Sequence, residues 1–225
     1  MTTDCVGGVW TYAMTLCRAL APHGVDVTLA ISGGEMSEAQ RREVDQIATV
    51  EWHHRPFKCE WMQPPLADVA AAGEWLDDLV AEVRPDVIHL NDYAHGGRDF
   101  GGLSRVVVAH SDVYSWHAAV LGQAPDASWR GYREAVEAGL AGADVVVAPT
   151  RAVLDGMVAW IGDRSAATAA ASGWVIANAV DGIGEPADER EPFVLSAGRV
   201  WDEAKNVKLL AEAAGGFLMP VKIAG

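Results

Sequence analysis

Residues 4–12 read Asp4-Cys5-Val6-Gly7-Gly8-Val9-Trp10-Thr11-Tyr12, a glycine pair followed directly by a helical pattern. The apolar positions of that pattern are Val9, Ala13, Leu16, Cys17 and Leu20. Glycine lets the backbone turn sharply and lets a ligand approach it, and a helix that begins here directs free N–H groups outward. The stretch therefore predicts a cradle for an anion or a sugar. A tight strand-to-helix turn without a ligand is the simpler alternative.

The composition limits the classes of protein to which the chain can belong. Its 225 residues carry a formal net charge of −14, which argues against nucleic acid as a partner because phosphate backbones bind basic surfaces. No run of about 18 uncharged apolar residues occurs, so we expect no transmembrane segment, and no secretory signal precedes the first helix. Cys5, Cys17 and Cys59 fit free thiols in a reducing compartment. We expect a cytoplasmic protein, with peripheral binding to the inner membrane left open.

Strand and helix patterns alternate after the first helix. The expected strands are 25–31, 49–53, 87–90, 105–109, 144–148 and 173–177, and the expected helices between them are 38–47, 66–83, 128–140 and 150–161. This alternation predicts an α/β fold with a Rossmann-like parallel sheet. Ligands of such sheets bind beyond the carboxyl ends of the strands.

The chain is expected to contain one lobe and the start of another. Residues 1–178 form the first lobe, residues 179–191 are a polar linker, and residues 192–225 open a second Rossmann-like lobe with a strand, a helix and a strand. Only Met1-Thr2-Thr3 precede the glycine turn, too few residues for the strand expected there. We therefore expect a chain that is truncated at both ends.

Two cations follow the first strand of the second lobe. Arg199 comes directly after that strand, and Lys205 lies six residues later, in the expected first turn of the next helix. A guanidinium and an ammonium in front of a helix N-terminus suit a diphosphate. The alternative is that both are surface charges paired with Asp202 and Glu203.

Taken in order, four motifs resemble the retaining glycosyltransferases of family 4, which have the GT-B fold. They are Val-Gly-Gly-Val-Trp-Thr-Tyr at 6–12, His110-Ser111, Val175-Ile176-Ala177-Asn178-Ala179-Val180-Asp181, and Gly198-Arg199 with the downstream Lys205. Each motif alone is weak, and the resemblance rests on their order across the whole chain. The link departs from the family, which often has Asn-Gly where this chain has Asn178-Ala179.

The resemblance implies a role for each matching residue. Gly7 and Gly8 would line the cleft near the donor phosphates and the acceptor, and His110 would orient a hydroxyl of the transferred sugar. Arg199 and Lys205 would neutralise the leaving diphosphate. The donor would be a nucleotide sugar, a hexose would be transferred with retention, and neither a cofactor, a metal nor a protein nucleophile would be needed. The family's paired glutamates of the second lobe would lie beyond Gly225.

The acceptor side is predicted from polar and aromatic residues at strand ends. Asn91, Asp92 and Tyr93 follow the strand 87–90, and Trp10 could stack on a sugar, as could Trp61 and Trp116. The acceptor itself, a glycan, a lipid or a small molecule, stays open. Local backbone hydrogen bonds are the alternative for the polar groups.

A metal site is not expected at His53-His54, because adjacent residues of a strand point to opposite faces. A nicotinamide dehydrogenase requires Gly-x-Gly-x-x-Gly, and only the glycine pair and Glu35 support it. A nucleotide-sugar epimerase and a catalytically silent binding or interaction module remain as alternatives.

Overall fold

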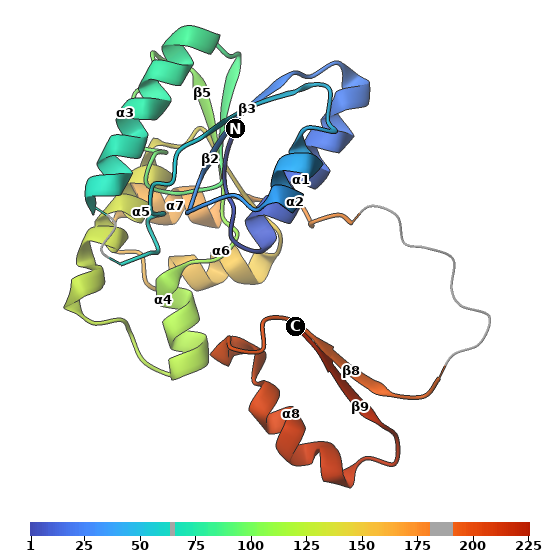
Figure 1. Cartoon of the computed structure of the whole chain (residues 1–225). Coiled ribbons are helices and arrows are strands. Elements are labelled where there is room, and N and C mark those ends of the chain that lie inside the picture. The colour runs from blue at the N-terminus through green and yellow to red at the C-terminus, as the bar shows by residue number, and fades with distance from the viewer. Residues whose placement is uncertain (64–65, 181–190) are drawn as a thin grey trace. The chain divides into compact units, whose positions relative to one another are not determined.

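The structure is a computed structural model that describes residues 1–63, 66–180 and 191–225. The chain forms two compact units (Figure 1). The larger one holds the described residues up to 180 except 120–122, and residues 191–225 belong to the smaller one. The predicted linker falls mostly on residues 181–190, together with the final Asp181 of the third motif, and so lies outside the described residues.

The first sheet of the larger unit is parallel and has the order β1-β2-β3. Its strands are β1 (Thr2–Asp4), β2 (Val27–Ser32) and β3 (Val50–His54), and they alternate with α1 (Gly8–Leu20) and α2 (Glu38–Val44). A short 3₁₀ turn, Ala21–His23, ends the first helix, and Gly24 closes it in the left-handed conformation. Ser37 and Gln40 form a capping box that begins α2.

The expectation that too few residues precede the glycine turn for a strand is wrong in one respect. Thr2, Thr3 and Asp4 are buried and pair with Ala30, Ile31 and Ser32 of β2. A strand of this length suffices because its ladder partner and its burial hold it in place. The glycine turn is therefore anchored at the carboxyl end of a buried strand.

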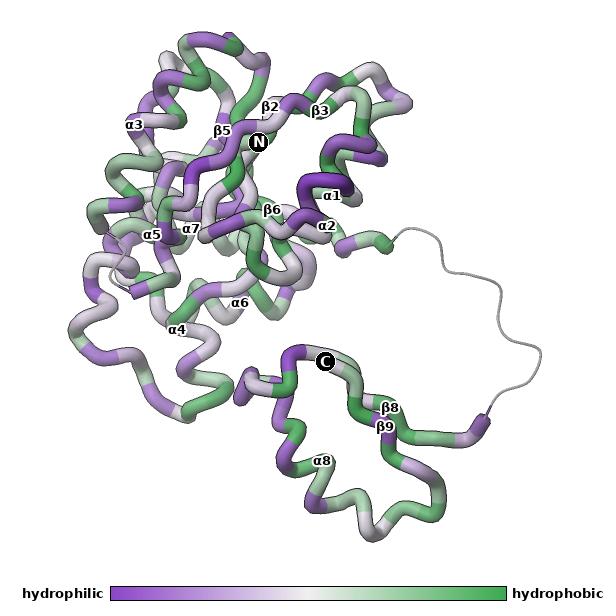
Figure 2. Tube along the Cα trace, viewed as in Figure 1, coloured by the Kyte–Doolittle hydropathy of each residue, from purple (hydrophilic) through white to green (hydrophobic). Residues whose placement is uncertain are grey.

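The second sheet of the larger unit is also parallel and has the order β4-β5-β6-β7. It contains β4 (Val87–Leu90), β5 (Ser104–Val108), β6 (Val145–Ala148) and β7 (Trp174–Val175), with α3 (Leu66–Val83), α5 (Arg130–Gly142), α6 (Arg151–Val158) and α7 (Arg164–Ala171). Its core consists mainly of Leu90, Val107, Val136, Leu140, Leu154 and Met157. Hydrophobic and hydrophilic residues alternate along α3 (Figure 2), as expected for a helix that buries one face.

The two sheets meet where β1 lies beside β4. No strand ladder joins them among the described residues, and instead Asn91 and Asp92 hydrogen-bond to Thr2. The strand order therefore reverses between β1 and β4, which is the position where open α/β sheets bind ligands. The predicted α/β fold with Rossmann-like parallel sheets is confirmed.

Three helical segments were not predicted. α4 (Val113–Trp116) begins at an Asp112 cap and continues into a π-helical turn, His117–Leu121. α7 begins at an Asp163 cap and buries only Ala166 and Ala170. Alanine carries little of the contrast from which helical periodicity is recognised, so an alanine-rich segment leaves a weak signal.

The smaller unit is a parallel βαβ element, as predicted. β8 (Val194–Ala197) pairs in parallel with β9 (Val221–Ala224), and α8 (Val207–Ala213) lies between them in the chain. Lys205 does not lie in the first turn of that helix, as expected, but in a preceding 3₁₀ turn, Glu203–Lys205. Asn206, with φ 45°, interrupts the helical path between the two.

Candidate functional site

The glycine turn places an uncapped helix N-terminus at the surface. Gly7 is the N-cap of α1 with φ 76° and ψ −136°, a conformation that residues with a Cβ atom avoid. No side chain caps the helix, and its first turn contains no acidic residue. Both glycines are exposed, and a Cβ atom added at Gly8 would meet nothing within 4 Å. Free N–H groups that face open space are suited to an anion.

One turn further along α1, Tyr12 contacts the residues at the carboxyl ends of β4 and β5. Its ring meets the ring of His110 edge-on, with centroids 4.6 Å apart, and its hydroxyl lies 3.5 Å from Nε2 of His89. Burial lowers the pKa of both histidines to about 4, so both rings are neutral at pH 7. The structure thus brings His110 to the same part of the fold as the start of α1, as the sequence predicts.

The residues after β4 hold the fold together at the junction of the sheets. Asp92 accepts hydrogen bonds from Thr2 Oγ1 at 2.7 Å and from His95 Nδ1 at 2.6 Å. Tyr93 is 4% exposed, and its hydroxyl donates to the carbonyl oxygen of Ser111 at 3.0 Å. Neither Asp92 nor Tyr93 is free to bind an acceptor in this arrangement, because both carboxylate oxygens of Asp92 accept internal hydrogen bonds and Tyr93 is buried. Asn91 contacts His110 instead, at 2.9 Å from Oδ1 to Nε2.

Trp10 is also placed differently from the expectation. It is 5% exposed, packs in the core of the first sheet, and its Nε1 donates to Glu43 Oε2 at 2.7 Å. It is therefore a core residue and cannot stack on a sugar in this arrangement. Trp61, which is 41% exposed, is the more accessible ring of this region.

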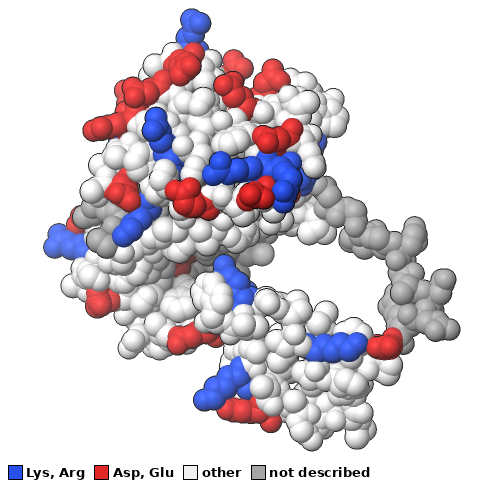
Figure 3. Space-filling model, viewed as in Figure 1, with Lys and Arg blue, Asp and Glu red and all other residues white. Residues whose placement is uncertain are grey.

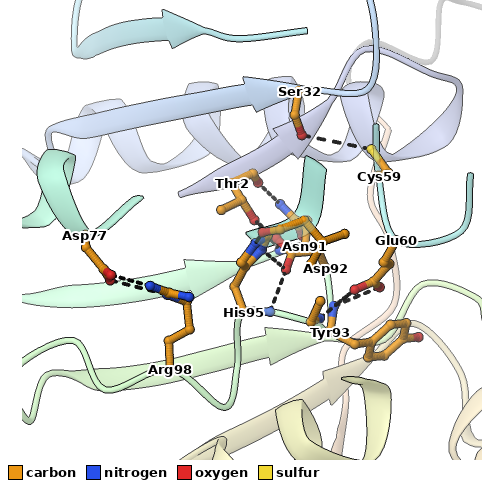
Figure 4. Close-up of polar contacts among 12 residues, drawn as sticks. Thr2, Ser32, Cys59, Glu60, Asp77, Asn91, Asp92, Tyr93, His95 and Arg98 are labelled. Atoms are coloured by element: carbon orange, nitrogen blue, oxygen red, sulfur yellow. Dashed lines mark hydrogen bonds and ion pairs between the residues drawn. The ribbon is translucent and has the colours of Figure 1, made fainter. Parts of the chain in front are cut away.

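The sequence did not point to Glu60, a residue after β3 whose side chain hydrogen-bonds to the backbone after β4 (Figure 4). Its buried carboxylate accepts hydrogen bonds from the backbone N–H groups of Tyr93 at 2.9 Å and Ala94 at 2.5 Å. Burial and the nearby Asp92 raise the pKa of Glu60 to about 7, and burial raises the pKa of Asp4 to about 6. The only signal was an acidic residue in an irregular loop, which does not distinguish a buried carboxylate from a solvated one.

A cavity of about 30 Å³ lies beside these carboxylates. Its lining residues are Thr2, Thr3, Asp4, Ser32, Cys59, Glu60, Trp61, Asn91 and Asp92. This volume has room for about two water molecules and not for a sugar. The carboxylates therefore form a structural cluster behind the glycine turn.

The two predicted cations of the smaller unit lie on one turn. The Arg199 side chain is 46% exposed, and its guanidinium pairs with Asp202 at 2.7 Å and lies over the Trp201 ring at 5.3 Å from its centroid. The Lys205 side chain passes Gly198, 3.6 Å from where a Cβ atom would be. Among residues 191–225, no ion pair holds Lys205. The ion pair of Arg199 with Asp202 is the contact expected if Arg199 is a surface charge.

Charged side chains elsewhere form no continuous basic surface on the face seen in Figure 3, where acidic and basic groups are interspersed. Within the described parts of the chain, no group of three metal-ligating side chains is arranged to hold an ion. No helix among those residues is long and apolar enough to cross a bilayer.

Comparison with known proteins identifies the family and the fold of the chain. A family model described as Glycosyltransferase Family 4 matches residues 6–181. No curated protein matches the sequence. Among solved structures, the chain is similar to LpCGTa, whose crystal structure is in complex with UDP, at 16% identity and a TM-score of 0.54. The similarity covers 100% of this chain and 69% of LpCGTa, and at this identity it concerns the fold.

Proposed function

The chain belongs to glycosyltransferase family 4, and on that premise we propose that it transfers a hexose from a nucleotide sugar to an acceptor with retention of configuration. One observation carries the proposal. The uncapped N-terminus of α1 faces open space at Gly8, and the neutral ring of His110 lies against Tyr12 one helical turn away. The N–H groups at the start of α1 suit an anion, and a ring nitrogen of His110 can hydrogen-bond a sugar hydroxyl.

In the larger unit, the free N–H groups behind Gly7 bind a phosphate of the donor. A Cβ atom at Gly8 would occupy the open space that this phosphate needs. His110 orients the sugar. No protein nucleophile is required: the bond from the sugar C1 to the phosphate oxygen breaks, and the acceptor oxygen bonds to C1 on the same face. The acceptor proton passes to the departing phosphate.

In the smaller unit, Arg199 and Lys205 stabilise the diphosphate as it leaves. Negative charge grows on the leaving group as the C1–O bond breaks, so fixed cations bind the transition state more strongly than the donor and lower the barrier. Asp202 competes with the donor diphosphate for Arg199, because its carboxylate forms an ion pair with the Arg199 guanidinium.

The proposal includes neither a cofactor nor a metal ion, and the nucleotide sugar is a co-substrate. The acceptor is a glycan, a lipid or a small molecule. Cys5, Cys17 and Cys59 are free thiols, which supports placing the protein in the reducing cytoplasm.

The test is a transfer assay with the full chain. UDP-glucose, UDP-galactose and GDP-mannose are each offered with simple sugar alcohols as acceptors, and proton NMR follows the release of nucleoside diphosphate and the anomeric configuration of the product. We expect an α-linked product from an α-linked donor, and loss of that product in His110→Ala. A β-linked product would contradict retention. Hydride transfer with NAD in place of sugar transfer would contradict the proposed reaction class.

A further inference from the structure

The direction of each hydrogen bond between Thr2 and Asn91 is determined by the atoms involved. The Asn91 side chain reaches the backbone carbonyl oxygen of Thr2 at 2.7 Å, and a carbonyl oxygen can only accept. The atom of Asn91 that faces Thr2 is therefore its NH₂ group. The backbone N–H of Asn91 also donates to Thr2 Oγ1 at 2.9 Å, which fixes the position of the residue from a second side.

The Thr2 hydroxyl likewise has a fixed donor and a fixed acceptor role. Thr2 Oγ1 accepts from the Asn91 N–H and donates its own proton to Asp92 at 2.7 Å, and Asp92 binds His95. Each group thus has the one role that its neighbours allow (Figure 4). Thr2 and His95 are buried and Asp92 is mostly shielded, so water competes little for these bonds.

With its NH₂ group committed to Thr2, Asn91 presents its amide oxygen to His110. The distance from this oxygen to His110 Nε2 is 2.9 Å. An amide oxygen only accepts, so Nε2 must carry the proton. The His110 ring is also held by the edge-on contact with Tyr12. The side-chain amide of Asn91 therefore determines which nitrogen of His110 is protonated.

The other ring nitrogen of His110 remains available. Within the described residues, no group hydrogen-bonds to Nδ1, and this atom is not among the fully buried polar atoms that lack a partner. Solvent therefore reaches it. Burial lowers the pKa of His110 to about 4, so at pH 7 the ring carries one proton, and Nδ1 has a free lone pair.

We propose that Asn91 is a positioning residue that holds His110 as the neutral Nε2–H tautomer, so that the bare Nδ1 accepts a hydrogen bond from a hydroxyl of the donor sugar. The assignment of the tautomer rests on the Thr2–Asn91–His110 geometry alone. The identity of the ligand as a sugar rests on the proposed function. His110 in this state orients a hydroxyl group and cannot donate to the phosphate through Nδ1.

The tautomer is measured by long-range ¹H–¹⁵N NMR of the full chain at pH 7. The signals of His110 are identified by their absence in His110→Gln and by connection to its backbone assignment. We expect a protonated Nε2 and a bare Nδ1 in the ligand-free protein. A protonated Nδ1, or an imidazolium, would overturn the assignment without reference to any activity.

Three variants separate the role of Asn91 from a general effect on folding. In Asn91→Ala, the Nδ1–H tautomer becomes populated, and the two ring-nitrogen resonances move toward each other. Thr3→Val is the matched control, because the hydroxyl of the neighbouring Thr3 donates to the carbonyl oxygen of Asp4 and takes no part in the Thr2–Asn91–His110 chain, so its His110 signals stay as in the wild type. Asn91→Asp keeps an acceptor oxygen beside Nε2 but loses the N–H that donates to the Thr2 carbonyl oxygen, so Nε2 should stay protonated while the new carboxylate raises the pKa of His110. An unchanged tautomer in folded Asn91→Ala would show that Asn91 does not position His110.

The ligand is tested with UDP-glucose against UDP. The His110 Nδ1 resonance should shift on binding of UDP-glucose and stay in place with UDP, because only the former carries the sugar. Binding of UDP-glucose that leaves Nδ1 unmoved would overturn the sugar contact. Failure to bind any nucleotide sugar would count against the proposed function, while the tautomer result would stand separately.

Discussion

The glycine turn of the larger unit and the Gly198–Lys205 turn of the smaller unit both carry residues proposed to bind the donor, but they are held in different ways. His110 and the start of α1 are held by partly buried contacts, among them Asn91 and Tyr12. Arg199 is half exposed and held by the carboxylate of Asp202. The first turn is thus preorganised, whereas the second must exchange an ion pair for a ligand. Changes in the first turn should act through geometry, and changes in the second through charge.

The largest effect is expected from Arg199→Ala. Removal of a cation that stabilises the leaving group should cost roughly 2 to 4 kcal/mol in the transition state, which lowers kcat/KM about 30- to 1,000-fold. Steady-state kinetics with the preferred nucleotide sugar measures it. Lys208→Ala is the control, because Lys208 is an 89% exposed cation of the same unit that pairs with Glu212. An unchanged kcat/KM in Arg199→Ala would remove this residue from the proposed mechanism.

Substitution of Gly7 and of Gly8 by alanine should change the stability of the larger unit in opposite directions. Gly7→Ala places a Cβ atom at φ 76° and should destabilise the larger unit by about 1 to 3 kcal/mol. Gly8→Ala has open space and should stabilise α1 by up to about 1 kcal/mol, yet weaken binding of a nucleotide sugar. Urea unfolding and calorimetric titration measure the two effects. If Gly8→Ala leaves binding as strong as in the wild type, the open space at Gly8 does not hold the donor.

The pH dependence of stability tests whether the ion pair between His95 and Asp92 stabilises the junction of the two sheets. Asp92 raises the pKa of His95 to about 9, against the burial that lowers it. Because this folded pKa exceeds the unfolded value, the stabilisation is complete below about pH 6.5 and is lost as the pH rises to about 9. A shift of this size corresponds to a loss of about 3 kcal/mol in the free energy of unfolding. His95→Gln should flatten this pH dependence, and a wild type of constant stability across that interval would contradict the charged pair.

The smallest effect is expected from Asp202→Asn. This change removes the carboxylate that holds Arg199 but keeps the shape of the side chain. Pyrophosphate should then bind roughly two- to fivefold more tightly, because an exposed ion pair contributes little. Titration at low salt measures the gain. Weaker binding in Asp202→Asn would mean that Asp202 orients Arg199 and does not compete with the ligand.

The sequence predicted the elements whose hydrophobic period is strong. The bounds of α3 and β4 agree with the predicted 66–83 and 87–90, since both segments have a clear apolar pattern between breaks. The parts of the candidate site that follow from local sequence, Gly7 and the position of His110 after β5, were also found where the motifs placed them.

The remaining contacts of the site depend on residues far apart in the chain. Asn91 and Thr2 are 89 positions apart, and Glu60 reaches Tyr93 across 33. Spacing along the sequence cannot show that these groups meet. The burial of Trp10, in contrast, could have been predicted from the sequence. Trp10, Ala13, Met14 and Cys17 recur at helical spacing and are all buried, which assigns Trp10 to the core.

Donor binding at the start of α1 is tested most directly by an NMR titration of the ¹⁵N-labelled full chain with UDP-glucose, GDP-mannose and, separately, NAD. We expect a nucleotide sugar to shift the backbone amides of Gly8 and Val9, because their N–H groups bind the donor phosphate, and NAD to leave them in place. Tight binding of NAD, or binding of a nucleotide sugar that leaves both amides unmoved, would contradict this expectation.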